Sequence, residues 1–126
     1  MGFLFMAHSG FRYLVLLVGV AALIVSLIKG KDDVAGKVMG AFVGLVDLQV
    51  LMGLLLLTQI PFYGQLMGHV AMMFAAVFAA HGFSVAAKKK PEGQRGMLRA
   101  AGVVVTLGLI VMGIMSIGRP ILGSSI

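Results

Sequence analysis

Four long apolar stretches, separated by short polar connections, dominate the sequence. They cover residues 4–28, 38–60, 66–87 and 97–117, and Asp32 and Asp33 lie in the first connection. An α-helix rises about 1.5 Å per residue, so roughly twenty residues cross a hydrocarbon core of about 30 Å. The pattern therefore predicts one all-α domain over residues 1–126, an antiparallel bundle of four transmembrane helices.

The composition supports a membrane protein and excludes several other classes. Hydrophobic residues make up 60% of the chain and charged residues 11%, with no cysteine. The mean hydropathy of +1.10 means more apolar surface than a soluble domain of this size can bury. Without cysteine, the chain itself forms no disulfide and provides no thiolate for a metal or an iron–sulfur cluster.

The basic residues predict the orientation of the bundle. The first and third connections and their flanks carry the main group of cations: Lys29, Lys31, Lys37, Lys88, Lys89, Lys90, Arg95 and Arg99. The other end holds only Arg12 and Arg119. The positive-inside rule then places both termini outside the cytoplasm, in a multi-pass protein of the bacterial inner (cytoplasmic) membrane. Because the net charge of +6 is explained by these connections, no nucleic-acid partner is expected.

The two halves of the chain resemble each other at an offset of about sixty residues. His8 corresponds to His69 and Gly36 to Gly96, while Met52-Gly53 corresponds to Met112-Gly113. If the chain is a repeat of one helical hairpin, the two copies are parallel and related by a pseudo-twofold axis along the membrane normal. Apolar sequence of low complexity also produces such alignments by chance, so both interpretations stay open.

Two histidines at matched depth provide the sharpest chemical signal. Counted back from Lys29 and Lys88, His8 and His69 lie about 31 Å and 28 Å along their helices, near the outer face. Two imidazoles on different helices of a bundle, at matched depth, are the arrangement that binds the iron of a b-type haem. Arg12, one turn from His8, then pairs with a propionate or another anionic group. Interfacial histidines that only pack or face water are the alternative.

Other residues extend this hypothesis to the space around the histidines. Gln49, one turn before Gly53, approaches either a cofactor edge or a neighbouring helix. Four small residues are expected to leave room for a flat macrocycle: Gly10, Gly68, Ala71 and Ala76.

A second polar set is expected in the inner half of the membrane. Asp47 lies near the middle of the second span and His81 at a compatible depth in the third. An ionised carboxylate is costly there, so the two are expected to pair, either to lock two helices together or to pass protons. Gly36, Gly40 and Gly44 form a small-residue stripe that is typical of a helix-packing surface.

The same residues resemble a group of small bacterial four-helix membrane proteins often labelled cytochrome b-like and frequent in Bacteroidota. The resemblance is carried by His8-Ser9-Gly10-Phe11-Arg12-Tyr13, Asp47-Leu48-Gln49 with Gly53, and His69 followed by Met72-Met73. The pattern of the group has Trp, His and Glu where this chain has Tyr13, Asp47 and Gly68. The resemblance implies haem and electron transfer.

We therefore expect a small membrane subunit of a bacterial electron-transfer complex, with haem b held by His8 and His69 and a quinone, a lipid or another subunit as partner. The alternative is a cofactor-free accessory subunit that stabilises a larger membrane complex. A proton-coupled transporter using Asp47 and His81 would need a polar path across the membrane, and the outer half offers few polar residues. No nucleotide loop, zinc-protease motif or serine triad indicates a catalytic site.

Overall fold

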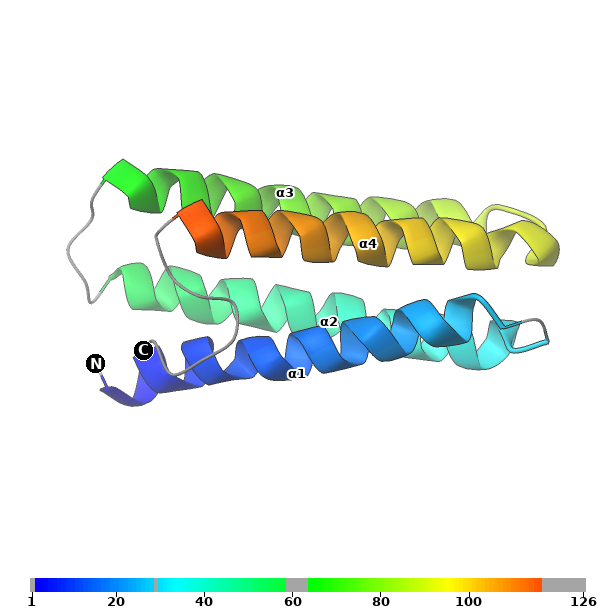
Figure 1. Cartoon of the computed structure of the whole chain (residues 1–126), viewed down its shortest axis with the longest axis horizontal. Helices are drawn as coiled ribbons and strands as arrows, with labels where there is room; N and C mark the ends of the chain where they lie inside the picture. Colours follow the sequence, from blue (N-terminus) through cyan, green and yellow to red (C-terminus); the bar gives the residue numbers. More distant parts are fainter. Residues whose placement is uncertain (1, 29, 59–63, 117–126) are drawn as a thin grey trace.

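The computed structural model of the chain is an antiparallel bundle of four α-helices (Figure 1). It describes residues 2–28, 30–58 and 64–116. The helices are α1 (Gly2–Ser26), α2 (Asp32–Leu57), α3 (Gly64–Lys88) and α4 (Glu92–Ser116). Each covers most of one predicted span, and all four are long and apolar enough to cross a membrane. The predicted all-α four-helix bundle is thus confirmed, and the chain is compatible with a multi-pass membrane protein. Lys29, Pro61, Arg119 and Pro120 lie outside the described residues.

The helix ends follow from local chemistry, with one correction to the sequence analysis. Asp32 and Asp33 were expected in a connection, but they form the first turn of α2. Carboxylates are favourable there because they face the positive end of the helix dipole. Gly30 provides the left-handed turn between α1 and α2, with a φ angle of +80°. Pro91 directly precedes α4, and a proline is tolerated at a helix start because no intrahelical N–H bond is lost.

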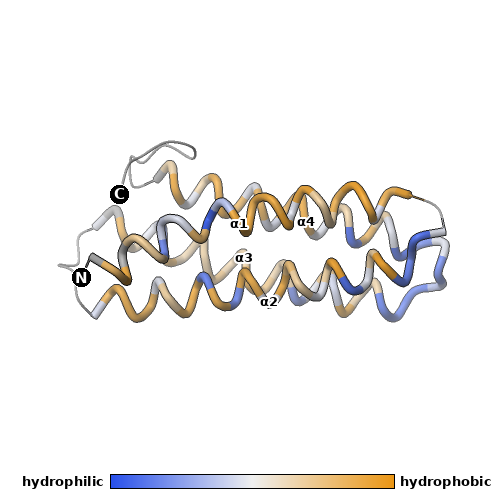
Figure 2. The backbone as a smooth tube through the Cα atoms, turned by 90° about the horizontal axis from the view of Figure 1, so that it is seen from below, coloured by the Kyte–Doolittle hydropathy of each residue, from blue (hydrophilic) through white to orange (hydrophobic). Residues whose placement is uncertain are grey.

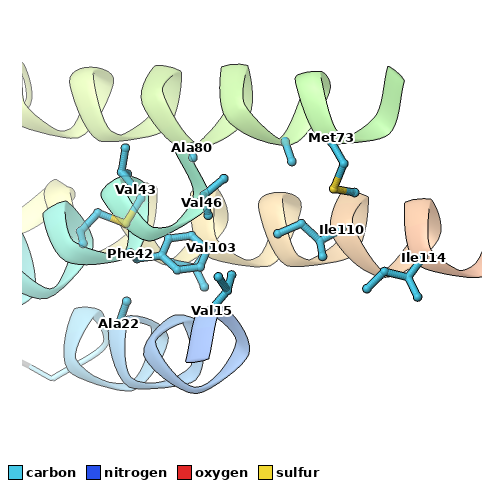
Figure 3. Packing of buried hydrophobic residues seen from close by; sticks show 12 residues of the cluster. Val15, Ala22, Phe42, Val43, Val46, Met73, Ala80, Val103, Ile110 and Ile114 are labelled. Atoms are coloured by element: carbon cyan, nitrogen blue, oxygen red, sulfur yellow. The ribbon is translucent and has the colours of Figure 1, made fainter. Parts of the chain in front are cut away.

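The helices pack as two hairpins. α3 packs most extensively on α4 and α1 on α2, and the hairpins meet through α1 with α4 and α2 with α3. Among the described residues, α1 makes no close backbone contact with α3, so these helices are diagonal in the bundle. Figure 3 shows the core, where Phe42 and Val46 of α2 lie near Val103 of α4 and face Val15 of α1.

The outer surface of the bundle is apolar along its length. Large hydrophobic side chains point outwards from every helix, and Phe78 of α3 is 74% exposed. Figure 2 shows hydrophilic residues gathered at the end that holds the α1–α2 and α3–α4 connections. A soluble protein does not expose apolar surface on all sides of its helices, so the lipid is the natural cover for this one.

An ionic cluster joins the two hairpins at this charged end. Arg99 of α4 donates to the Asp32 carboxylate at 2.6 Å, and Arg95 donates to its other oxygen at 3.0 Å. The Arg99 side chain is only 7% exposed and lies over Gly36, where a Cβ atom would come within 3.2 Å of the guanidinium. From the sequence, Arg95 and Arg99 indicated only the orientation of the bundle. Their spacing of four residues places them on one helix face and could have predicted that both bind the same carboxylate.

Glycine contacts also separate the predicted small-residue stripe into two parts. Gly36 lies under Arg99, whereas a Cβ atom added at Gly40 or Gly44 would meet nothing within 4 Å. The stripe therefore packs against the rest of the chain only at its charged end, and its other two glycines face outwards.

We predict that Asp32→Asn lowers the melting temperature of the detergent-solubilised protein by several degrees, because the largely buried Arg99 loses its anionic partner. Asp33→Asn is the matched control. Among the described residues, the one ion pair of its carboxylate is with Lys37, at 3.7 Å, and both side chains are at least 77% exposed. Such an exposed pair contributes little to stability. Equal shifts for the two variants in a thermal unfolding assay would contradict the importance of the cluster.

Candidate cofactor site

A cavity of about 120 Å³ lies inside the bundle, towards the end at which α1 begins. We call it the histidine cavity. Its polar lining consists of His8, Ser9, Arg12, Gln49 and His69. Apolar residues complete the wall, among them Met73, Ile110 and Ile114, which Figure 3 shows together. The structure therefore brings His8, Arg12, Gln49 and His69, all predicted as cofactor-binding residues, to one cavity.

A backbone carbonyl orients the imidazole of His69. Its Nδ1 atom lies 2.9 Å from the carbonyl oxygen of Gly113 on α4. A carbonyl only accepts hydrogen bonds, so Nδ1 carries the hydrogen, and in the neutral ring Nε2 is then the nitrogen with the lone pair. Metal-ligating histidines are commonly fixed in this way, with the second nitrogen held by a carbonyl or carboxylate. Glycine is favoured at this contact, because a Cβ atom at Gly113 would lie only 3.1 Å from Met72 Cβ, whereas its distance of 3.5 Å from His69 Nδ1 would be an ordinary van der Waals contact.

The imidazole of His8 packs against α2 in a similar way. A Cβ atom at Gly53 would lie 2.9 Å from His8 Cε1, so the ring occupies the space that the glycine leaves. One turn earlier, Gln49 Nε2 donates to the His8 carbonyl oxygen at 2.7 Å. The other amide atom, Gln49 Oε1, is buried and has no hydrogen-bond partner among the described residues. It is therefore an acceptor available to water or to a ligand group in the cavity.

The two histidines thus have equivalent surroundings in the two hairpins. His8 of α1 lies against Gly53 of α2, and His69 of α3 lies against Gly113 of α4. These are the positions that the sequence alignment of the two halves pairs with each other. The repeated contact supports the repeat as a structural feature rather than a chance alignment. Gly113 was not named as a site residue, although its correspondence with Gly53 was the signal for it.

Arg12 brings a positive charge to the cavity wall. The residue is 6% exposed. Its guanidinium donates to the Tyr13 hydroxyl at 3.1 Å and to the Ser9 hydroxyl at 3.4 Å, and it lies 4.9 Å from the centre of the Tyr13 ring. A cation held in a largely apolar wall favours a ligand with an anionic group or a strong acceptor.

The small residues that were expected to make room for a macrocycle are only partly placed there. Gly10, Gly68 and Ala71 are exposed and do not line the cavity, whereas Ala76 does. The helical wheel explains the difference, because Ala76 follows His69 by seven residues and shares its face, while Gly68 and Ala71 are turned away from it. Gly53 and Gly113 leave the space beside the two histidine rings instead.

The predicted polar pair forms, but on the outside of the bundle. His81 Nε2 lies 2.9 Å from Asp47 Oδ1 and 2.8 Å from Oδ2. The side chains of His81 and Asp47 are 51% and 43% exposed, and neither lines the histidine cavity. The contact joins α2 to α3. Among the described residues, neither Asp47 nor His81 forms a hydrogen bond with a polar residue of the cavity.

The donor set of the histidine cavity suits a macrocyclic metal cofactor better than a bare ion. No group of three His, Cys, Asp or Glu residues in the described part of the chain is placed to hold a metal ion. Two imidazoles alone leave most coordination positions of an ion unfilled. A porphyrin provides four equatorial nitrogens, so two axial histidines complete the coordination of its iron.

Comparisons of the chain with family models, curated proteins and solved structures found no match. The resemblance to cytochrome b-like proteins therefore stays a prediction from the residue pattern.

We predict that Gly113→Ala destabilises the protein by about 1–3 kcal/mol, because the added methyl group overpacks the contact of α4 with Met72, Met73 and His69. Gly108→Ala is a control on the same helix, since a Cβ atom there would meet nothing within 4 Å. It should be neutral or stabilising by up to about 1 kcal/mol through helix propensity. Chemical unfolding in detergent compares the two, and the opposite order would show that the glycine contact is unimportant.

Proposed function

We propose that this chain is a membrane subunit of a bacterial electron-transfer system that holds a haem b between His8 and His69 near the outer face. The observation that carries the proposal is that both histidines line one cavity although α1 and α3 are diagonal in the bundle. When bound, the haem would exchange single electrons with a quinone or with another subunit.

Four of the five polar residues of the cavity have a role in this proposal. His8 and His69 would hold the haem iron, and the Gly113 carbonyl keeps the Nε2 lone pair of His69 available for a metal. The Arg12 guanidinium would neutralise a propionate, and Gln49 Oε1 would accept a hydrogen bond from a water molecule beside the cofactor. These residues bind and orient the cofactor, and they neutralise its charge.

The size of the cavity sets a condition on binding. A cavity of about 150 Å³ accepts a benzene ring, so 120 Å³ encloses about one ring and not a whole porphyrin. Side chains must therefore move apart when a macrocycle binds. Leu54 of α2 and Phe74 of α3 both line the cavity and are 39% and 41% exposed, so they can turn outwards into the lipid. Both residues lie on the two helices α2 and α3. Of the four contacts between neighbouring helices, the contact of α2 with α3 is the least extensive, so these helices can separate most easily.

Because the cavity is too small to enclose a porphyrin, a second candidate function is a cofactor-free accessory subunit that stabilises a larger membrane complex. In that case the histidines serve packing against Gly53 and Gly113, and the cavity holds water or the headgroup of a lipid. The two proposals differ in whether the purified protein contains haem.

We expect the protein, expressed with a haem precursor and purified in mild detergent, to show a b-type reduced-minus-oxidised spectrum with about one haem per chain by the pyridine haemochrome assay. His8→Ala and His69→Ala should each abolish the signal, because one axial ligand is lost. His81→Ala is the matched control, since it changes the third histidine, which does not line the cavity, and it should keep the spectrum. A blank spectrum from folded wild-type protein would favour the accessory subunit, and a normal spectrum in His8→Ala would rule out these ligands.

We also predict that Arg12→Gln lowers the midpoint potential of the haem, because a nearby positive charge stabilises the added electron. Arg12→Lys keeps the charge and should leave the potential closer to that of the wild type. A spectroelectrochemical titration of the three proteins measures the difference. An unchanged potential in Arg12→Gln would mean that Arg12 does not face the cofactor.

A further inference from the structure

The Asp47–His81 pair lies at the depth of the hydrocarbon and faces away from the bundle. His81 precedes Lys88, at the end of α3, by seven residues, which is about 10 Å along a helix. The exposed residues around the pair are apolar, including Leu48 and Leu51 of α2 and Phe78 of α3. Aspartate and histidine side chains are too short to reach the membrane surface over that distance, unlike lysine or arginine.

A half-exposed ionic pair is costly in lipid. Lipid tails offer no hydrogen bonds to the remaining lone pairs of the carboxylate or to the second ring nitrogen of the histidine. Within the described residues, the pair makes no hydrogen bond besides the contacts of His81 Nε2 with both Asp47 oxygens. The pair therefore favours cover by a polar protein surface over cover by lipid.

The surface beside the pair allows another helix backbone to approach closely. Gly44 and Gly40 precede Asp47 by three and seven residues, which places all three near one face of α2. A Cβ atom at either glycine would meet nothing within 4 Å, so the space above both is open. The Gly-x-x-x-Gly spacing is the one at which membrane helices cross with their backbones in contact.

We propose that this face of α2 and α3 binds a second copy of the chain, in a dimer whose twofold axis runs along the membrane normal. In such a dimer α2 crosses its copy at Gly40 and Gly44. A twofold axis along the membrane normal places each residue and its copy at the same depth. The second copy thereby brings an ionic pair to the depth at which the first one needs polar cover.

The charges of the pair are self-complementary in this arrangement. His81 Nε2 donates to Asp47 within each chain, and in a protonated ring Nδ1 is a second donor. When His81 is protonated, that donor can bind a free lone pair of the second copy's Asp47, and two imidazolium and two carboxylate groups then form a neutral ring. A foreign helix would need its own polar group at this depth, whereas a second copy always has one.

Disulfide cross-linking tests the dimer, because the natural chain contains no cysteine. In isolated membranes under mild oxidation, Gly44→Cys should form a species of twice the 13.2 kDa chain mass. Gly108→Cys is the matched control, because Gly108 is also exposed in its span, with nothing within 4 Å of its Cβ position, but it lies on α4. It should stay monomeric. Leu51→Cys, on the same side of α2 and 52% exposed, is a second reporter if Gly44→Cys does not fold.

The role of the ionic pair is tested by adding Asp47→Leu to the cross-linking variant, which should reduce the dimer yield at least severalfold. Absence of cross-linking in folded Gly44→Cys and Leu51→Cys would overturn the proposal. Loss of a different membrane protein from the purified Gly44→Leu variant, without cross-linking between copies, would also overturn it, because this face would then bind that protein and not a second copy. Equal cross-linking of Gly44→Cys and Gly108→Cys would indicate random collisions and overturn it as well. The haem spectrum does not enter this test, so the two proposals fail independently.

Discussion

Close approach of helices at glycine positions is the constraint on which this bundle depends. In lipid the hydrophobic effect does not drive helices together, because the tails are as apolar as the side chains. Association then rests on van der Waals contact and on hydrogen bonds between helices. The Phe42 ring of α2 packs against Gly19 of α1, and Phe83 of α3 packs against Gly102 of α4. Gly96 of α4 lies against the carbonyl oxygen of Ser26, at the end of α1. Each contact joins a pair of helices at a point where a methyl group would collide.

The histidine cavity follows from the same constraint. Gly53 and Gly113 allow the two imidazole rings to approach the neighbouring helix closely, and the ring of His69 also bonds the Gly113 carbonyl. The rings are thereby held at the cavity wall instead of filling its centre. A pair of larger residues at the glycine positions would push the histidines inwards and close the space between the hairpins.

The sequence was sufficient for the fold, because the spans depend on length and apolarity, which are local properties. It also placed His8, Arg12 and His69 in the outer half, assigned Gln49 to the cofactor site, and paired Asp47 with His81. It did not give the direction in which each side chain points, since that depends on how neighbouring helices are rotated about their axes. For this reason Gly10, Gly68 and Ala71 were assigned to the interior but are exposed. The contact of Asp32 with Arg95 and Arg99 was missed because it joins segments more than sixty residues apart.

The three polar groups of the bundle differ in what surrounds them, and this difference indicates which of them need a partner. The Asp32 cluster is satisfied within the chain, since its carboxylate binds two arginines at the charged end. Gln49 Oε1 is buried beside an internal cavity and has no hydrogen-bond partner among the described residues, so an internal ligand or water is the natural complement to its hydrogen-bonding capacity. Asp47 and His81 bind each other but face outwards, so their complement has to come from outside the chain. The cavity lies towards the end at which α1 begins and the ionic pair lies closer to the charged end, so a cofactor and a second copy are compatible at different depths of one molecule.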